Sequence, residues 1–303
     1  MRGDVTRLAP RRERGAAESA VVTASYAPDF ERCKLLCETM DRYVTGFTRH
    51  YILVEHRDVA LFRQLEGARR VVIDERDLLP GWLRPFPDPT SLFRRRIWLS
   101  VRTQPLRGWH VQQLRRMAAA FHLRERTLVY CDSDVVFLKD FDCASFRRNE
   151  KLRLFRRDNA LAQPVAYNHH LWSRNAALSL GLPAEPPSLH DYITTLIAWD
   201  AAAVREMCTL VERRHGRSWI EVIASTREFS ECMLYGRYVD DVLSAAGHFH
   251  DQTELCRVYW FGPAPSDALF HDFVAEMGSE QVAIGLQSFI GTDVARIRKL
   301  IAA

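Results

Sequence analysis

Short apolar runs with β-propensity alternate along this chain with amphipathic stretches of helical spacing, and this alternation most constrains its fold. Such a pattern indicates βαβ units, in which helices cover a sheet of mainly parallel strands. Strands are predicted at residues 21–25, 50–54, 70–73, 127–131, 152–155, 193–199 and 282–286. Helices are predicted at residues 28–43, 58–65, 108–123, 175–180, 201–213, 229–238 and 292–301. We therefore expect an α/β fold with a Rossmann-type mixed, mostly parallel sheet flanked by helices.

The chain is expected to form one domain preceded by a basic tail. Its 303 residues, 47% of them hydrophobic, are enough to bury one large core. The sequence after residue 19 has no internal repeat or linker, so residues 20–303 are assigned to a single domain. Residues 1–19 contain arginines but no apolar core, so they predict a flexible tail rather than a secretory signal. Such a tail would allow peripheral contact with anionic lipid at the inner face of the plasma membrane.

The cysteines and the short apolar runs favour a cytoplasmic protein. The seven cysteines form no CxxC pair and lie mainly in apolar segments, as reduced core residues of a cytosolic protein do. No uncharged apolar run of the sequence reaches the ~18–20 residues that a membrane-spanning helix requires.

The regular pattern is interrupted between Asp74 and Gly108. This stretch contains five prolines and several aromatic residues, so we expect a long irregular segment there. Loops of this length in compact domains are usually functional. The segment is therefore a candidate lid that closes over a ligand.

The sharpest functional signal is Asp132-Ser133-Asp134, which directly follows the predicted buried strand 127–131. Open α/β sheets bind ligands at the carboxyl ends of their strands, where these two carboxylates would lie. Mg²⁺ and Mn²⁺ prefer oxygen ligands and leave positions open for phosphate oxygens. The pair therefore predicts a divalent cation that holds a diphosphate.

An arginine-rich stretch precedes this strand. From Pro89 to Arg124 the sequence has eight arginines and no aspartate or glutamate. Guanidinium groups bind phosphate in a bidentate manner, so the stretch suits an anionic substrate. Most of these arginines are expected on a solvated surface, and we assign the phosphate contact first to Arg116.

Two further signals lie in the second half of the chain. The apolar neighbours of Glu231 predict a buried carboxylate on a helix, and burial would raise its pKa toward that of a general base. A purely structural role, as an acidic residue in the first turn of a helix, fits the spacing of Glu231 equally well.

His248 and His250 alternate along an extended segment, so both imidazoles would lie on one side and could supply a metal ligand, or simply pack.

Four segments, taken in order, resemble a known family: VVTASYAPDF, GWHVQQLRRMA, LVYCDSDVVF and FSECMLYG. They are similar to a bacterial family of DxD-containing, glycosyltransferase-like proteins with the GT-A fold, the fold of nucleotide-diphospho-sugar transferases. The resemblance covers most of residues 20–290. It implies a nucleotide-sugar donor, most commonly a UDP-sugar, a divalent Mn²⁺ or Mg²⁺, and a glycan or glycolipid acceptor.

The resemblance also implies roles for individual residues. The nucleotide sugar would contact Thr23, Ser25, Tyr26, Gln112, Arg116 and Asp132. The metal would be held by Asp132, Asp134 and His248, with His250 as the alternative histidine. The catalytic base of an inverting reaction would be Glu231, with Asp191 as the alternative.

The function expected from these features is metal-dependent sugar transfer in the synthesis of bacterial envelope polysaccharide or lipopolysaccharide. One alternative is a haloacid dehalogenase-type phosphatase with Asp132 as nucleophile, because a strand followed by DxDxV also resembles that family's motif. Another is a non-catalytic scaffold that binds a sugar nucleotide. No nucleic-acid partner is expected, because the net charge is only +4 and the arginine-rich stretch lacks interleaved aromatic side chains.

Overall fold

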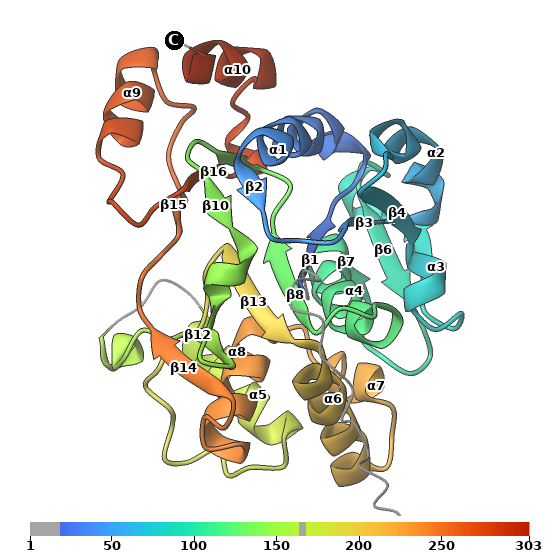
Figure 1. Cartoon of the computed structure of the whole chain (residues 1–303). Helices are drawn as coiled ribbons and strands as arrows, with labels where there is room; N and C mark the ends of the chain where they lie inside the picture. The colour runs from blue at the N-terminus through green and yellow to red at the C-terminus, as the bar shows by residue number, and fades with distance from the viewer. Residues whose placement is uncertain (1–18, 164–167, 303) are drawn as a thin grey trace, which may run out of the picture.

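The computed structural model describes residues 19–163 and 168–302, so the predicted basic tail lies outside the described part, except for Ser19. Figure 1 shows a single α/β domain in which helices lie around the strands of a central sheet. The chain therefore has the predicted fold class.

The central sheet contains five strands in the order β13-β8-β1-β3-β4. β1 (Ser19–Ala24), β3 (His50–Val54), β4 (Arg70–Asp74) and β8 (Thr127–Cys131) run parallel, and β13 (Leu196–Asp200) pairs antiparallel with β8. Every residue of β1 and β8 is buried, as expected for parallel strands covered on both faces. The prediction of a mixed, mostly parallel sheet is confirmed.

The strand order reverses between β1 and β8. From β1 the chain builds β3 and β4 on one side, and it later adds β8 on the other side. Val22 of β1 pairs with Tyr130 of β8, so the two strands end at similar levels. At such a reversal, α/β proteins bind ligands in a crevice at the carboxyl ends of the strands.

Helices pack on both faces of the sheet because successive strand residues point to opposite sides. Val21 lies in one apolar cluster with α1 (Phe30–Tyr43). Val22 lies in another with α4 (Gly108–His122) and α6 (Ala201–His215). The two faces of β1 therefore belong to separate cores.

The expectation of an irregular segment between residues 74 and 108 is wrong. The segment forms α3 (Glu75–Leu78) and an antiparallel sheet of β5 (Arg84–Pro87), β6 (Arg96–Leu99) and β7 (Leu106–Arg107). β5 is an edge strand of this sheet, a position where proline is tolerated. The prolines therefore do not exclude regular structure.

Buried contacts hold this segment against the rest of the domain. Trp98 of β6 is buried in the same cluster as α4. Arg115 Nε donates to Glu75 Oε2 at 3.1 Å, and Arg96 Nε donates to Glu55 Oε1 at 2.9 Å. These partners lie far apart in the sequence, so local patterns do not reveal them.

The second half of the chain builds two smaller sheets beside the central one. One contains β15 (Cys256–Tyr259), β16 (Ala283–Leu286) and β9 (Val135–Phe137), and the other β11 (Arg147–Arg148), β12 (Lys151–Phe155) and β14 (His248–Asp251). The chain also contains α2 (Val59–Phe62), α5 (His169–Ser179), α7 (Trp219–Ile223), α8 (Glu231–Arg237), α9 (Asp267–Ala275), α10 (Val294–Ala302), β2 (Val44–Thr45) and β10 (Phe141–Asp142). α9 and α10 share an apolar cluster with a residue of α1 (Figure 1).

Several predicted elements have different limits in the structure. α8 begins at Glu231 because Ser230 caps it, with Ser230 Oγ accepting from the Met233 N–H at 3.4 Å. α5 begins at His169 rather than at residue 175, and β13 begins at Leu196 rather than at residue 193.

The seven cysteines all lie in the described part of the chain, where they are free and buried as predicted. Within residues 19–163 and 168–302, no helix combines the length and the apolar character needed to cross a membrane.

Gly236 of α8 lies against the ring of Tyr192, which leaves no room for a side chain. A Cβ atom at Gly236 would lie 2.1 Å from Cγ of Tyr192. We expect Gly236→Ala to lower the free energy of unfolding by about 2–3 kcal/mol, because overpacking of a tight core is costly. Urea denaturation measures the change. Gly108→Ala is the control, since no described atom beyond its chain neighbours and its own helix backbone lies within 4 Å of the added Cβ, and equal effects would contradict the packing argument.

Candidate functional site

Asp132 and Asp134 lie in the loop between β8 and β9, at the reversal of strand order. The Val135 N–H donates to the Asp132 carbonyl at 3.2 Å and closes a turn. The end of β16 and the residues that follow it contact this turn: the Leu286 N–H donates to the Asp134 carbonyl at 3.2 Å, and the Ser288 N–H donates to Asp134 Oδ2 at 3.1 Å. Backbone hydrogen bonds therefore hold the loop from both sides.

One carboxylate oxygen of Asp134 is suited to bind a cation. Its Oδ1 atom is buried and has no hydrogen-bond partner among the described residues. Burial and the negative charges of Asp132 and Asp29 raise the pKa of Asp134 to about 7. A buried oxygen without a partner costs free energy, and a bound cation would remove that cost.

Asp29 is a third carboxylate near this loop, and it was not among the residues predicted from the sequence. It ends η1 (Ala27–Asp29), which closely follows β1, and it is buried. Burial raises the pKa of Asp29, although the charge of Arg32 and a hydrogen bond from Ser288 act in the opposite direction. Its position just after β1 was the available signal, because β1 and β8 end side by side.

Arg116 of α4 joins Asp132 to Glu231. One terminal nitrogen of Arg116 donates to Asp132 Oδ1, and the other donates to Glu231 Oε1 at 2.9 Å. The Asp132 side chain is 28% exposed, whereas Arg116 and Glu231 are buried. Burial acts to lower the pKa of Arg116, but the two carboxylates outweigh it and raise the pKa. The arginine therefore stays charged and fixes both carboxylates.

Glu231 is the first residue of α8 and is buried beside α4. Its N–H donates to Gln113 Oε1 at 2.9 Å. Burial raises the pKa of Glu231, and the charge of Arg116 acts in the opposite direction. Gln112, which was predicted to bind the nucleotide-sugar donor, is half-buried. Its neighbour Gln113 makes the contact with the Glu231 N–H instead. One residue turns a helical side chain by about 100°, so sequence position alone did not distinguish the two glutamines.

The three residues near the end of β1 that were predicted to contact the nucleotide sugar have different environments. Tyr26 is 46% exposed, and burial and the charge of Asp29 raise its pKa. Ser25 is buried, with an Oγ atom that has no hydrogen-bond partner in the described part of the chain. Thr23 is fully buried, and its Oγ1 lies 2.9 Å from His50 Nε2. The structure therefore buries the Thr23 side chain against His50 instead of presenting it at the carboxyl end of β1, which does not fit its predicted contact with the nucleotide sugar.

The structure does not bring His248 to the aspartates. His248 Nε2 lies 2.8 Å from the Tyr235 hydroxyl, which accepts a hydrogen bond from the Asp200 N–H at 2.9 Å. Asp200 pairs with Thr127, the first residue of β8, whereas Asp132 follows the last one. The two ends of this strand are roughly 15 Å apart. His248 therefore does not belong to the proposed cation site.

His250 and Asp191 belong to other polar clusters. His250 Nε2 lies 2.7 Å from Asp240 Oδ1, so this histidine does not belong to the proposed cation site either. Asp191 is fully buried; its Oδ2 accepts from Arg157 at 2.7 Å and lies 3.1 Å from His169 Nδ1. Burial acts to raise the pKa of Asp191, but the hydrogen bond with His169 and the charges of His169 and Arg157 lower it overall. A fully buried carboxylate can act on a ligand only through its neighbours.

Asp132 and Asp134 are the residues suited to hold a divalent cation. Two carboxylates, one with the buried Oδ1 atom described above, match the oxygen ligands that Mg²⁺ and Mn²⁺ prefer. Among the residues that the structure describes, no group of three or more His, Cys, Asp and Glu side chains could hold a metal ion. The pair therefore fits a cation whose other ligands are water and phosphate oxygens, rather than a closed protein site.

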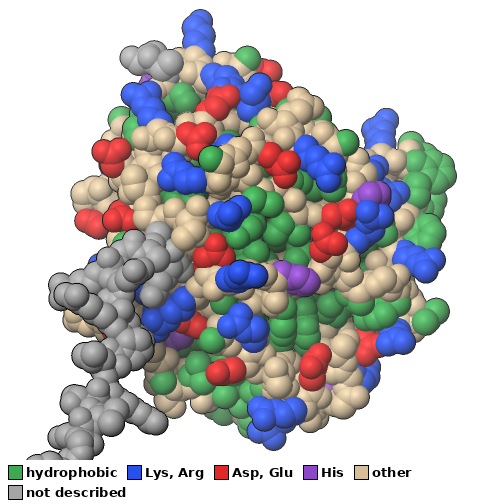
Figure 2. All heavy atoms as spheres, turned by 45° about the vertical axis from the view of Figure 1, so that its right-hand side comes forward, with side chains coloured by type: hydrophobic (Ala, Val, Ile, Leu, Met, Phe, Trp, Pro, Cys, Tyr) green, Lys and Arg blue, Asp and Glu red, His purple; other side chains and the backbone are tan. Residues whose placement is uncertain are grey.

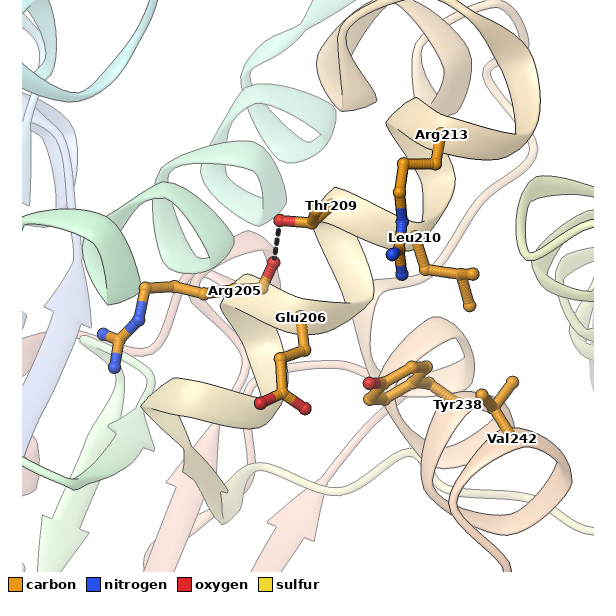
Figure 3. Close-up of a pocket in the computed structure, with 7 residues that line it drawn as sticks. All are labelled: Arg205, Glu206, Thr209, Leu210, Arg213, Tyr238 and Val242. Carbon is orange, nitrogen blue, oxygen red and sulfur yellow. Dashed lines mark hydrogen bonds between the residues drawn. The ribbon is translucent and has the colours of Figure 1, made fainter.

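A pocket of about 370 Å³ lies elsewhere, between α6 and η7 (Tyr238–Val242) (Figure 3). It is lined by Arg205, Glu206, Thr209, Leu210, Arg213, Tyr238 and Val242. Burial and the Glu206 carboxylate raise the pKa of Tyr238 to about 12. Tyr238 follows the last residue of α8, whereas Glu231 is the first. This pocket therefore lies at the other end of α8 from the candidate site.

On the face drawn in Figure 2, basic side chains are interspersed with acidic ones, and hydrophobic side chains gather between them. This face therefore presents no continuous basic strip of the kind that follows a nucleic-acid backbone.

Comparisons with known proteins identify a family and two similar structures. The sequence profile of a family described as "Family of unknown function (DUF6492)" matches residues 19–280. A search of curated proteins finds no match. A crystal structure of an active-site mutant of LgtC is 11% identical, with a TM-score of 0.47, and covers 93% of this chain and 95% of that chain. A structure of the galactosyltransferase LgtC in complex with donor and acceptor sugar analogues is 11% identical, with a TM-score of 0.45 and the same coverage of both chains.

Proposed function

The chain belongs to DUF6492, a family of unknown function, and we propose that it is a glycosyltransferase. It would transfer a sugar from a nucleotide-sugar donor, foremost a UDP-sugar, to a glycan or glycolipid acceptor. We further propose that it works in the cytoplasm, at the inner face of the plasma membrane, in the synthesis of bacterial envelope polysaccharide or lipopolysaccharide.

The observation that carries this proposal is the aspartate pair at the reversal of strand order. Asp132 and Asp134 follow β8, where the ligand crevice of such a sheet opens, and the Oδ1 atom of Asp134 is buried and suited to a cation. Mn²⁺ or Mg²⁺ held there would act as a Lewis acid that stabilises the charge of the departing nucleoside diphosphate.

Residues near the carboxyl ends of β1 and β8 would bind and orient the nucleotide-sugar donor. Arg116 fixes the Asp132 carboxylate, which is exposed enough to accept a hydrogen bond from a ribose hydroxyl or a water. Tyr26, at the end of β1, offers an exposed ring against which a nucleobase can pack. Ser25, next to it, and Gln112 of α4 remain candidates for donor contacts.

Glu231 is the residue best suited to accept a proton from the acceptor hydroxyl in an inverting reaction. Its side chain is 6% exposed, whereas that of Asp191 is fully buried; its pKa is raised, and its ion pair with Arg116 orients it toward Asp132. Asp191, the alternative base, is fully buried and would act only through His169 or Arg157.

The role of Glu231 predicts a separation of binding from catalysis. We expect Glu231→Gln to reduce sugar transfer at least about 100-fold, the size of a general-base contribution. UDP binding should stay within about threefold of the wild type, because glutamine can still accept a hydrogen bond from Arg116. Glu276→Gln is the control, since the Glu276 side chain is 67% exposed and pairs only with Arg257 among the described ion pairs. Equal loss of transfer and of UDP binding would contradict the assignment.

The two alternatives make different demands on the same residues. A phosphatase would use Asp132 as nucleophile, but this carboxylate is paired with Arg116, and no lysine of the described chain forms an ion pair with it. A non-catalytic scaffold would bind the sugar nucleotide without turning it over.

Release of nucleoside diphosphate from a panel of sugar nucleotides tests the proposed function. The assay is run with Mn²⁺ and with EDTA, beside a 4-nitrophenyl phosphate assay on the same protein. Mn²⁺-dependent release from one donor, absent in Asp134→Asn, supports the transferase. Hydrolysis of the phosphomonoester without any release from sugar nucleotides would favour the phosphatase, and tight donor binding without release would favour the scaffold.

A further inference from the structure

Three aromatic side chains form a row beside the candidate site. Trp109, in the first turn of α4, is 47% exposed. The ring centroids of Trp109 and Trp172 of α5 are 5.4 Å apart, and those of Trp172 and His169 are 5.1 Å apart, with these two rings stacked. Trp109 therefore presents an aromatic surface to solvent, with two further rings packed behind one another beside it, and a ligand with an apolar face can pack on such a surface.

Glu228 holds the middle ring of the row, that of Trp172, by a hydrogen bond. Its Oε2 atom accepts hydrogen bonds from Trp172 Nε1 at 3.2 Å and from Asn168 Nδ2 at 2.6 Å. Asn175 Nδ2 donates to the Glu228 carbonyl at 2.6 Å. The indole of Trp172 is therefore held in one orientation before any ligand binds, which lowers the entropic cost of binding.

The row is connected to Glu231 through Gln113. Gln113 Nε2 donates to the Trp109 carbonyl at 3.5 Å, and Gln113 Oε1 accepts from the Glu231 N–H at 2.9 Å. Trp109 and Arg116 are seven residues apart on one helix, which places them on one face about 10 Å apart along its axis. A molecule that covers Trp109 would thus extend toward the carboxylate proposed as the base.

Hydrogen-bonding groups surround the aromatic row. His169 Nδ1 lies 3.1 Å from Oδ2 of the buried Asp191, and Arg157 donates to the same oxygen at 2.7 Å. The Asp191 carboxylate fixes the imidazole of His169 and leaves its other ring nitrogen for a ligand. The charge of Asp191 is balanced by Arg157, whereas the Glu228 carboxylate beside Trp172 accepts only from neutral N–H groups among the described hydrogen bonds. This one unbalanced negative charge disfavours an anionic occupant such as a phosphate or an acidic lipid headgroup.

We propose that Trp109, Trp172 and His169 bind a neutral sugar ring of the acceptor. A pyranose has an apolar face of C–H groups, which an indole covers, and a rim of hydroxyls, which polar side chains bind. The exposed indole of Trp109, supported by Trp172, supplies the apolar surface, and His169, stacked on Trp172, supplies a polar group. This inference rests on the proposed function, since it names the acceptor side of that same site.

Binding of the fluorescently labelled full chain to an array of immobilised mono- and oligosaccharides tests the inference, in the presence of UDP and Mn²⁺. We expect the wild type to be retained on at least one neutral glycan and Trp109→Ala to lose at least about tenfold in affinity. Trp109→Phe keeps an aromatic ring and should stay within about threefold. Phe121→Ala is the matched control: Phe121 lies on the same helix, is 45% exposed and stacks on Trp219, so its loss should leave glycan binding unchanged.

Each outcome decides between the two proposals. Retention of Trp109→Ala equal to that of the wild type, or no retention of the wild type on any arrayed sugar, would overturn the acceptor site. UDP binding is measured in parallel by thermal shift on the same variants. Failure of every variant to bind UDP would contradict the transferase, whereas glycan binding that depends on Trp109 would stand without it.

Discussion

Arg116→Met is expected to lower the free energy of unfolding by about 3–5 kcal/mol, because it leaves buried Glu231 and partly buried Asp132 without their shared cation. Methionine fills a similar volume, so the loss reports the charge and hydrogen bonds rather than a cavity. Urea denaturation followed by circular dichroism measures the change, and an unchanged m-value would show that the unfolding reaction is the same.

Two further variants keep this prediction testable. Arg102→Met is the control, because Arg102 is 53% exposed and pairs with Glu221 at 3.1 Å at the surface, where such a pair is worth at most about 1 kcal/mol. Adding Glu231→Gln to Arg116→Met should recover at least about 1 kcal/mol, since it removes one uncompensated charge. Equal destabilisation by the two arginine variants would contradict the bridging role of Arg116.

Asp134→Asn is expected to abolish metal-dependent UDP binding, a loss of at least about 100-fold, and yet to stabilise the ligand-free protein. The stabilisation follows from the crowding of Asp134 by Asp132 and Asp29, which raises its pKa to about 7 together with burial. Asparagine is neutral, and its carbonyl can still accept from the Ser288 N–H. Function and stability therefore oppose each other at this residue.

The pH dependence has a definite sign. The pKa of Asp134 is higher in the folded chain than in the unfolded one, so the unfolded state releases this proton first as the pH rises. The wild type thus loses stability between about pH 4 and pH 7, and the asparagine variant does not. We expect a gain on the order of 1–3 kcal/mol at pH 8 and little gain at pH 4.5, with the exposed Asp140→Asn as control. Equal gains at both pH values would show that ionisation of Asp134 is not the cause.

Sequence patterns predicted those parts of the site that depend on local structure. Thr127–Cys131 is apolar throughout, and it forms a strand that is buried at every position. The carboxylates that follow it were predicted at the right place because parallel strands all end at one edge of the sheet. Arg116 and Glu231 were each selected for chemistry, and the structure pairs them although they lie 115 residues apart.

The predictions for His248 and for residues 74–108 were wrong because they depended on contacts that no local pattern contains. Alternation correctly suggested an extended segment at His248, but it did not tell which end of β8 that segment would approach. Strand alternation does explain Thr23, which shares a face with Val21 on the α1 side, away from the core that contains α4. The order in residues 74–108 arises from Trp98 and from the pair of Glu75 with Arg115, which only the folded chain brings together.

The most direct test of the account is calorimetric titration of the purified chain with UDP, once with Mn²⁺ and once with EDTA. The proposed site predicts binding that requires the metal and that raises the unfolding free energy by about 2.7 kcal/mol at a UDP concentration 100 times its Kd. The same titration with Asp134→Asn should give no heat of binding. UDP binding of equal strength with EDTA, or in the Asp134→Asn variant, would contradict a cation held by Asp132 and Asp134.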